Sequence, residues 1–317
     1  MGLPAGYELR APSKTELETV ADVVIADELY RTGQITLGAD FLRGEWSRPG
    51  FDPATDAWVV LDAQGIIIGY GQVRLDEPTI VGSWGAVHPD HQGRGAGSAL
   101  LDRIRSRSAA MLAGRPSGLL RHAAYADDQA VAAMLRDRGL HPVRHFWHLQ
   151  VDLGEQDFAA AATPAGVRID AVVPPDGLKV VYEVINEALA HNWDYEPKPF
   201  QRWIEEETSA PGYDPSLWLV AVHQGEPAGA LTASVGEDRG WVDYLGVLQP
   251  HRGRGIAVAL LHRAFAAFAQ RGVARALVSV DAHNATGATA VYERAGMRPV
   301  KAWDMWECSI VDTEQAG

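Results

Sequence analysis

The sequence predicts a mixed α/β (α+β) protein made of two tandem domains that share one fold. The first observation is length, because 317 residues suit two domains of roughly 150 residues each. The second is an internal repeat: QPHRGRGIAVALL at 249–261 has the same design as PDHQGRGAGSALL at 89–101, 160 residues earlier. The third is that β-rich segments and helical patterns follow one another in the same order in both halves.

The repeat extends beyond these two stretches. Several features that keep one spacing and one order indicate a duplicated domain rather than chance. We therefore expect an N-terminal domain over residues 1–155 and a C-terminal domain over residues 165–317, joined near Gly154–Gly166. Three further pairs recur at a spacing of 160 residues: Trp58 with Trp218, Gly65 with Gly225, and Gly69 with Gly229.

Each half is expected to contain the same series of elements, with a last strand that closes each copy. Proline- and aspartate-rich turns break the chain before each hairpin, and glycines end the last helices. The N-terminal half is expected to contain strands at 7–10, 57–62, 66–74, 79–87 and 119–125, and helices at 14–29, 95–107 and 128–138. The C-terminal half is expected to contain strands at 167–170, 217–223, 227–234, 240–247 and 276–281, and helices at 177–189, 255–270 and 285–295.

Composition excludes several classes of protein. A net charge of −13 argues against nucleic acid and anionic membranes as partners. The single cysteine, Cys308, excludes an internal disulfide framework and a cysteine-based zinc site, and we expect it to be a buried strand thiol. No secretory signal opens the chain, and no apolar run approaches the ~18 residues of a membrane span. We expect a cytoplasmic monomer or homodimer without a metal.

The two glycine- and arginine-rich turns are candidate phosphate sites. The first N–H groups of a helix lack partners, and the helix dipole favours an anion there. Glycines let a phosphate approach the backbone, and the arginines add positive charge. A tight turn with solvated arginines is the alternative for one copy, but two matching copies argue against it. The pattern is neither a Rossmann fingerprint nor a Walker loop.

The motifs QGRGAG at 92–97 and RGRGIA at 252–257 resemble the Gln/Arg-x-x-Gly-x-Gly/Ala motif of the GNAT superfamily of N-acetyltransferases. The segment NATGATAVYERAGM at 284–297 is similar to the late motif of that family. The resemblance covers nearly the whole chain, and tandem members of this length include mycothiol synthase-like actinobacterial acetyltransferases. It implies a mixed, mostly antiparallel central sheet flanked by helices in each domain, acetyl-CoA or another acyl-CoA as cofactor, and acyl transfer to the amine of a small molecule.

The resemblance also implies where the cofactor lies. The loop amides would hold the pyrophosphate, and backbone N–H groups of the preceding strand would hold the acyl carbonyl. In the C-terminal half the expected cofactor residues are Leu245, Val247, Arg252, Gly253, Arg254, Gly255, Ile256, Ala257 and Asn284. In the N-terminal half they are Val87, Gln92, Gly93, Arg94, Gly95, Ala96 and Gly97.

The two copies differ at the position that would supply the acid. In the family, a tyrosine of the late motif usually protonates the departing CoA thiolate, and here Tyr292 lies four residues before Gly296. The same count before Gly139 gives Leu135, which cannot donate a proton. Tyrosine can, with a reference pKa near ~10. A packing aromatic is the alternative for Tyr292, but a packing position would be filled alike in both copies.

The base is expected at Asp243. Many family members carry Glu four residues before the position of Leu245, but this sequence has Trp241 there. Strand alternation places Asp243 on the same face as Trp241 and Leu245, and its counterpart at a spacing of 160 is Ser83. Asp243 is therefore the candidate base, directly or through water. A solvated or substrate-binding carboxylate is the alternative.

The acceptor is expected to bind at the segment AHNWDYEPKPF, residues 190–200, which mixes aromatic and acidic groups. An ordinary helix connection is the alternative. The candidate substrate residues are His191, Trp193, Asp194, Glu196 and Trp241.

Three functions remain open from the sequence. The leading one is an N-acetyltransferase with a catalytic C-terminal domain and a degenerate N-terminal domain. The rivals are a non-catalytic acyl-CoA-binding regulator and an enzyme with two active halves. Mycothiol synthesis is a specific option that Trp241 weakens.

Overall fold

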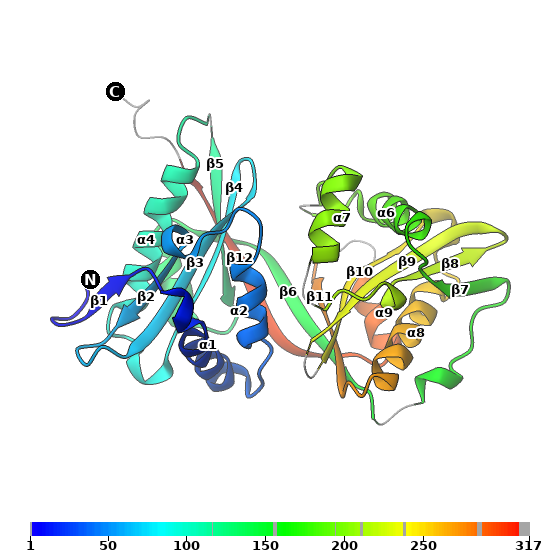
Figure 1. Ribbon diagram of the computed structural model, residues 1–317, viewed down its shortest axis with the longest axis horizontal. Helices are drawn as coiled ribbons and strands as arrows, with labels where there is room; N and C mark the ends of the chain where they lie inside the picture. Colours follow the sequence, from blue (N-terminus) through cyan, green and yellow to red (C-terminus); the bar gives the residue numbers. More distant parts are fainter. Residues whose placement is uncertain are drawn as a thin grey trace. The chain divides into compact units, whose positions relative to one another are not determined.

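The chain forms two compact units. The computed structural model describes residues 2–115, 117–154, 157–193, 195–209, 212–236, 239–283 and 287–310. The first unit combines Met1–His145 with Ala302–Gly317, and the second is Phe146–Lys301. In each unit, helices cover both faces of a mostly antiparallel arrangement of strands, as expected (Figure 1). None of the described helices combines the length and the apolar character that a membrane span requires.

In the first unit the strands follow the order β1-β2-β3-β4-β5-β12. Neighbours are antiparallel except β4 and β5, which are parallel. The strands are β1 (Glu8–Arg10), β2 (Ala57–Leu61), β3 (Ile67–Glu77), β4 (Ile80–Val87), β5 (Gly118–Tyr125) and β12 (Arg298–Ile310). The helices are α1 (Leu17–Thr32), α2 (Ala39–Trp46), the short α3 (Pro53–Asp56), α4 (Ala96–Met111) and α5 (Gln129–Arg136).

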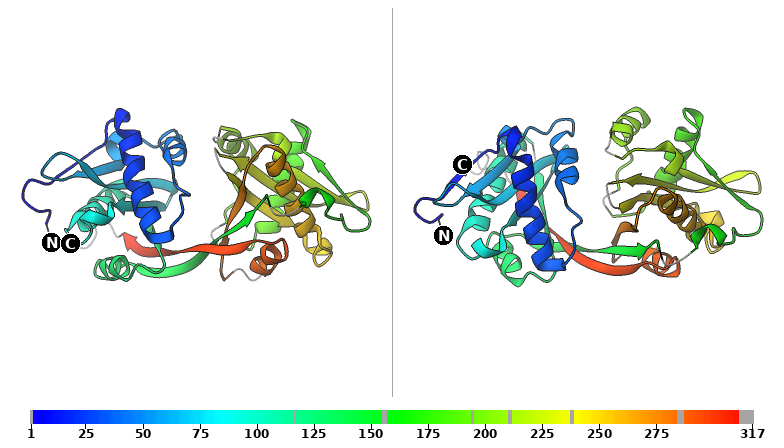
Figure 2. Two further views of the ribbon diagram at one scale, coloured as in Figure 1. Left: turned by 90° about the horizontal axis from the view of Figure 1, so that it is seen from below. Right: turned by 60° about the horizontal axis from the view of Figure 1, so that its bottom comes forward.

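Two apolar clusters lie on opposite faces of this sheet. Alternate side chains of β2 and β3 point to opposite faces, so each strand contributes to both clusters. On one face, Val20 and Val24 of α1 and Leu42 of α2 cover the strands. On the other, Leu100 and Ile104 of α4 pack with α5. Figure 2 shows α1, in dark blue, lying across the strands.

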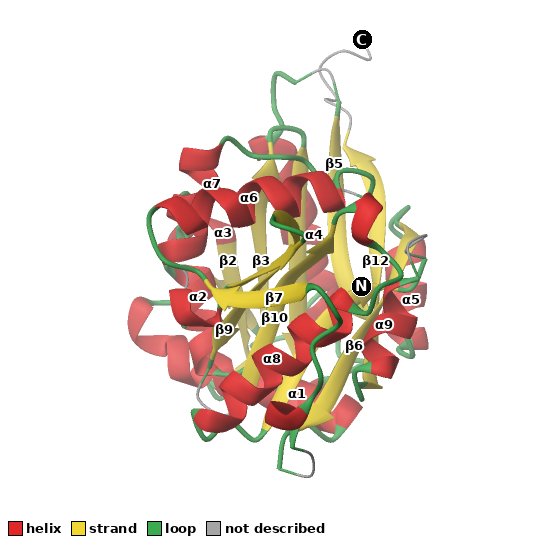
Figure 3. Ribbon diagram, turned by 90° about the vertical axis from the view of Figure 1, so that its right-hand side faces the viewer, coloured by secondary structure: helices red, strands yellow, loops and turns green. Residues whose placement is uncertain are grey.

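The second unit repeats this plan with the strand order β6-β11-β10-β9-β8-β7. Here α6 and α7 cover one face, and α8 and α9 cover the other. In Figure 3, which looks onto this unit, α6 and α8 lie on either side of β7. The strands are β6 (His141–Asp152), β7 (Val167–Ala171), β8 (Leu219–His223), β9 (Glu226–Val235), β10 (Arg239–Val247) and β11 (Arg275–Asp281). The helices are α6 (Asp176–Leu189), α7 (Phe200–Ser209), α8 (Ile256–Gln270) and α9 (Ala288–Arg294).

The last strand of each half pairs in the unit of the other half. Residues 146–152 of β6 pair with β11 of the second unit. Residues 303–310 of β12 pair with β5 of the first unit. The two units therefore do not coincide with a division of the chain between residues 155 and 165. The expectation that a last strand closes its own copy is wrong, because an edge strand can satisfy its backbone on either of two equivalent sheets.

Because β12 pairs in the first unit, a substitution near the C-terminal end of the sequence is expected to destabilise the unit that contains the N-terminal residues. Trp306 on β12 is 2% exposed and belongs to the core of the first unit. Trp306→Ala is expected to lower the free energy of unfolding by about 3–5 kcal/mol. Hydrogen exchange should then show lost protection in residues 2–145, whereas Val173→Ala, at a side chain 75% exposed, should change stability by less than about 0.5 kcal/mol. Loss of hydrogen-exchange protection confined to residues 146–301 would contradict the pairing of β12 in the first unit.

The helices and strands for which the sequence predicted bounds are present within a few residues, and α2, the short α3 and α7 are additional helices. The expected helix at 285–295 is described from Ala288 onward as α9. Helices α2 and α7 were not expected, although their apolar residues recur with helical periodicity, because α2 is only eight residues long and α7 contains the acidic run EEE. These two helices cover the sheet face that lies opposite the glycine-rich loops.

Candidate functional site

Each unit contains a wedge where two parallel strands separate. Strand β4 pairs with β5 only as far as Ser83 opposite His122. In the second unit, β10 pairs with β11 only as far as Val242 opposite Val278. Both β4 and β10 then continue toward the glycine-rich loop while pairing only with β3 or β9. One edge of each strand is thus left without a strand partner.

Backbone donors point into these wedges. The N–H of Leu248 donates to Ala228 of β9 at 2.9 Å. N–H groups alternate between the two edges of a strand, so those of Leu245 and Val247 point away from β9 into the wedge. His88 donates to Ile68 in the same way at 2.9 Å, which directs the N–H of Val87 into the first wedge. Leu245, Val247 and Val87 therefore lie where a carbonyl could be bound.

Both loops have the geometry of an anion site. Gly95 (φ 88°) and Gly255 (φ 79°) are N-caps in the left-handed region, which favours glycine. Ala99 and Ala259 make the first helical hydrogen bonds back to these glycines, each at 3.0 Å. In the part of the chain that the structure describes, the N–H groups of residues 93–98 and 253–258 donate to no main-chain oxygen. Six unpaired donors in each loop suit a pyrophosphate, and a Cβ at position 93 or 253 would meet nothing within 4 Å.

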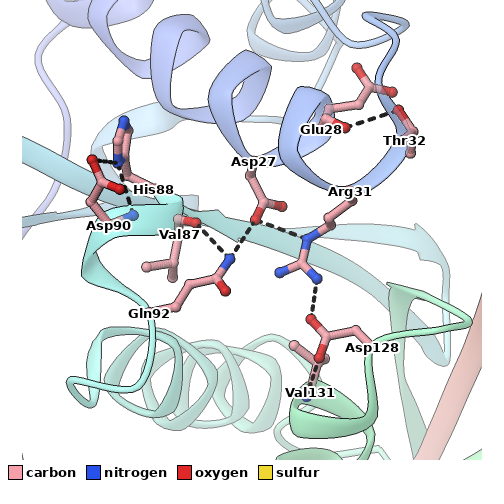
Figure 4. Close-up of polar contacts among 10 residues, drawn as sticks. All are labelled: Asp27, Glu28, Arg31, Thr32, Val87, His88, Asp90, Gln92, Asp128 and Val131. Carbon is pink, nitrogen blue, oxygen red and sulfur yellow. Dashed lines mark hydrogen bonds and ion pairs between the residues drawn. The ribbon is translucent and has the colours of Figure 1, made fainter.

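The first polar residue of each loop binds protein rather than open solvent. The amide of Gln92 donates to Asp27 at 3.2 Å and lies 3.5 Å from the carbonyl of Val87 (Figure 4). Arg252 donates to the carbonyls of Val247 at 3.0 Å and Ala188 at 3.3 Å. These two side chains tie the loop to the strand end and to the first helix of the unit. The side chains of Arg94 and Arg254 are exposed and remain available to an anion.

The first unit carries an ionic network beside its loop. Figure 4 shows Arg31 of α1 between Asp27 and Asp128, with Nε donating to Asp27 at 2.9 Å and a terminal nitrogen donating to Asp128. Asp128 also caps α5 by accepting the N–H of Val131 at 2.9 Å. Burial raises the pKa of Asp27 above its usual range, although the nearby Arg31 opposes the shift. The network joins α1, the loop and α5.

The second unit carries a β-bulge that the first lacks. Val242 pairs with Ala233 and Tyr244 pairs with the next residue, Thr232, so Asp243 is an inserted residue. The hydroxyl of Thr232 accepts the N–H of Tyr244 at 3.1 Å and completes the bulge. In the first unit, β4 pairs with β3 without interruption from Gly82 to Val87.

The bulge changes two expectations about Asp243. By strand pairing, Ser83 corresponds to Val242, so Asp243 has no counterpart in the first unit. The bulge also reverses the alternation of side chains. Leu245 packs against the α8 core, while Trp241 packs with His148 on the other face. The prediction that Asp243 shares a face with both Trp241 and Leu245 is therefore wrong for Leu245.

The carboxyl of Asp243 has the properties of a base near neutral pH. It accepts a hydrogen bond from the hydroxyl of Ser234 at 3.2 Å. Asp243 reaches solvent, but the protein packed around it desolvates the carboxylate, and the charge of Glu207 adds to this effect. Together they raise the pKa of Asp243 to about 7, against the smaller opposing effect of Ser234.

Tyr292 and Leu135 occupy equivalent places. The carbonyl of each accepts a hydrogen bond of 3.0 Å from the N–H of the residue that follows the glycine at the end of the helix. This donor is Met297 for Tyr292 and Leu140 for Leu135. The Tyr292 side chain is 7% exposed and lies against the α8 core. Burial raises the pKa of Tyr292 above its usual range, so the phenol stays protonated at neutral pH.

The acceptor-side residues are only partly brought together. Trp193 packs against Phe146 at 6.2 Å, and Trp241 packs edge-on to His148 at 5.4 Å. His191 and Glu196 are exposed. Asp194 and Asn284, both expected site residues, lie outside the described residues.

Sequence reasoning missed Glu207 on α7. Its charge raises the pKa of Asp243, Tyr244 and Tyr195, after burial in each case, so these groups lie near one another. Tyr195 also donates to Asn186 at 2.9 Å. No sequence signal distinguished Glu207 from the other acids of the run EEE, because α7 itself was not expected.

One pocket lies outside the wedge of the second unit. This pocket of about 270 Å³ lies between residues 158–169 and α8, and its lining includes His262 and Arg263 but no residue of the loop 252–258. Among the residues that the structure describes, no group of three or more His, Cys, Asp or Glu side chains is arranged to hold a metal.

Comparisons with known proteins agree with this geometry. The model described as the acetyltransferase (GNAT) family matches residues 179–297, and that of an acetyltransferase (GNAT) domain matches residues 53–137. The mycothiol acetyltransferase of Beutenbergia cavernae is 31% identical over 258 residues, covering 76% of this chain and 80% of that protein. That of Streptomyces coelicolor is 28% identical over 298 residues, or 93% of each chain.

A solved structure agrees as well. The crystal structure of a GCN5-related N-acetyltransferase from Sphaerobacter thermophilus has a TM-score of 0.86 and 28% identity, and the similarity covers 98% of both chains. The tandem arrangement expected from the repeat is thereby confirmed.

Proposed function

The chain belongs to the GNAT family of acetyltransferases, and from this membership we propose that its second unit transfers an acyl group from acyl-CoA to the amine of a small molecule. The observation that carries the proposal is the bulge at Asp243. It places a carboxylate of raised pKa beside the wedge of the second unit, where the first unit has no corresponding residue. Tyr292 supports it, since the first unit has Leu135 there.

Each step of the proposed reaction uses a hydrogen-bond donor, a base or an acid of the second unit in the protonation state that the step requires. Acyl-CoA, when bound, supplies the thioester carbon that the amine attacks. The loop N–H groups of residues 253–258 bind the pyrophosphate, and the N–H groups of Leu245 and Val247 stabilise charge on the carbonyl oxygen. Asp243 takes the proton that the attacking amine must lose. Tyr292 holds a proton at its phenol oxygen for the departing sulfur.

We further propose that the first unit binds acyl-CoA without turnover. As in the second loop, six of its N–H groups donate to no main-chain oxygen among the residues that the structure describes. The opposite face of its sheet is filled by aromatic side chains, with Trp84 packed 5.7 Å from Phe41 and 5.4 Å from Tyr70. Strand β4 pairs with β3 without interruption from Gly82 to Val87, so no residue of this strand corresponds to Asp243.

The acceptor is proposed to be a cationic or hydroxylated amine. Asp243 and Glu207 provide negative charge, and Trp241 and Trp193 provide aromatic surface. The relatives named mycothiol acetyltransferase make that reaction a second candidate. Release of free thiol with any primary amine separates both from a non-catalytic acyl-CoA-binding regulator.

The pH dependence of kcat/KM tests the role of Asp243. The base acts only when it is ionised, so kcat/KM should fall with decreasing pH below about 7, the pKa of Asp243. Asp243→Asn should remove this limb and lower the rate by about 10²–10⁴. Ser234→Ala removes a hydrogen bond that favours the ionised form, so the limb should move to higher pH while the plateau is retained. A limb that moves when a less basic amine is used would belong to the amine and would contradict this assignment.

A further inference from the structure

A row of side chains crosses four strands of the second unit on the sheet face that carries Trp241, here called the acceptor face. Strand pairing places Gln150 of β6 opposite Leu277 of β11, Leu277 beside Trp241 of β10, and Trp241 opposite Ser234 of β9. Residues paired across neighbouring strands point to the same face. Ser234 binds the carboxyl of Asp243, so this is the face where the proposed base lies.

The amide of Gln150 has a fixed orientation and an unused acceptor. Gln150 is 4% exposed, and its nitrogen donates to Asp152 at 2.9 Å. Asp152 also accepts from Arg298 at 2.8 Å. A carboxylate receiving a guanidinium can only accept, so the amide nitrogen must point toward it and the oxygen must point away. Within the described ranges that buried oxygen has no hydrogen-bond donor.

The first unit satisfies the matching position internally. By strand pairing, Leu277 and Gln150 correspond to Arg121 and Glu307. Arg121 donates to Glu307 at 2.9 Å and closes that position with an ion pair. In the second unit the arginine is replaced by leucine, which cannot donate. The open acceptor is therefore specific to the unit that carries the bulge.

The surroundings of Gln150 favour an uncharged donor. His148, the next side chain of β6 on this face, meets Trp241 edge-on at an interplanar angle of 82°. Burial, together with the nearby charge of Lys301, lowers the pKa of His148 to about 3, so the imidazole is neutral. The cation of Lys301 disfavours a second positive charge nearby. A hydroxyl group fits this wall better than an ammonium group.

We infer that Gln150 and His148 of β6 form a subsite for the acceptor, in which the amide oxygen of Gln150 accepts a hydrogen bond from a hydroxyl group of the substrate. This inference rests on the proposed acyl transfer in the second unit. β6 lies two strands from β10, about 10 Å, so amine and hydroxyl lie on opposite sides of a compact molecule. The acceptor class is a polyhydroxylated primary amine, such as an amino sugar. A strand from the N-terminal half of the sequence thus sets the specificity of the second unit.

The test replaces Gln150 with methionine and compares two amines, D-glucosamine and cyclohexylamine. Gln150→Met keeps the volume and removes the oxygen. The KM for D-glucosamine should rise about tenfold, while the KM values for cyclohexylamine and acetyl-CoA stay unchanged. Thermal stability should not fall, because an unsatisfied buried oxygen is removed. Glu307→Gln places an amide at the matching position of the first unit and should leave all three KM values unchanged.

Calorimetric titration of D-glucosamine against the CoA-loaded protein separates this inference from the proposed chemistry. Binding that weakens in Gln150→Met, but without thiol release from acetyl-CoA, would uphold the subsite and contradict the proposed function. Equal KM shifts for both amines, unchanged binding in Gln150→Met, or no binding of D-glucosamine by the wild-type protein would overturn the subsite.

Discussion

Replacing Tyr292 with phenylalanine is expected to lower kcat by about 10²–10⁴ and to leave the Kd for acetyl-CoA unchanged. The phenol is buried and its raised pKa keeps it protonated, so it can deliver a proton to the departing thiolate. Phenylalanine fills the same volume in the α8 core but carries no proton. Single-turnover release of free thiol measures the effect separately from product release.

A matched control comes from the first unit. Tyr125 is also a tyrosine whose pKa burial raises, and it lies beneath Arg31 at 5.5 Å from the ring centre. Tyr125→Phe should change kcat by less than about twofold, because the proposed chemistry takes place in the other unit. If Tyr292→Phe retains wild-type kcat, the tyrosine is a packing residue and the acid must be another group.

Gly253→Asp is expected to lower kcat/KM for acetyl-CoA by at least about 10²-fold, whereas Gly93→Asp should leave thiol release near its wild-type rate. Gly253 and Gly93 have φ of 74° and 72°, and a Cβ at either position meets nothing within 4 Å. Aspartate tolerates this conformation better than most residues, so the fold should persist. Its carboxylate repels a pyrophosphate that approaches the loop amides.

These two variants are matched in backbone and surroundings, so they differ only in the unit that they affect. Steady-state thiol release with saturating amine checks both. Equal losses in the two variants would mean that both units perform the reaction, and a loss only in Gly93→Asp would place the chemistry in the first unit.

The sequence predicted the parts of the site that depend on local backbone. Gly95 and Gly255 fit a strand-to-helix turn, because glycine adopts the left-handed conformation at little steric cost. Tyr292 and Leu135, paired in the sequence by their distance from a glycine, also occupy equivalent positions in the two units, since the glycine that follows each of them ends its helix in the same way. Repetition within one chain supplied what an alignment would otherwise supply.

The sequence could not predict features that depend on pairing between distant strands. At Asp243 the pairing register of β9 and β10 shifts by one residue, and a constant spacing of 160 residues between the loops conceals this inserted residue. Likewise, the exchange of β6 and β12 is a choice between two similar sheet edges. The sequence therefore assigns Gln150 to the N-terminal half, although it lies in the second unit on the same sheet face as Trp241.

Titration calorimetry of acetyl-CoA against the wild-type protein and the two loop variants most directly tests the claim of two cofactor sites around one active site. Two binding events per chain are expected in the wild-type protein, and one in each of Gly93→Asp and Gly253→Asp. A single event in the wild-type protein that persists in Gly93→Asp and disappears in Gly253→Asp would contradict it, because the first loop would then be a structural turn with no cofactor.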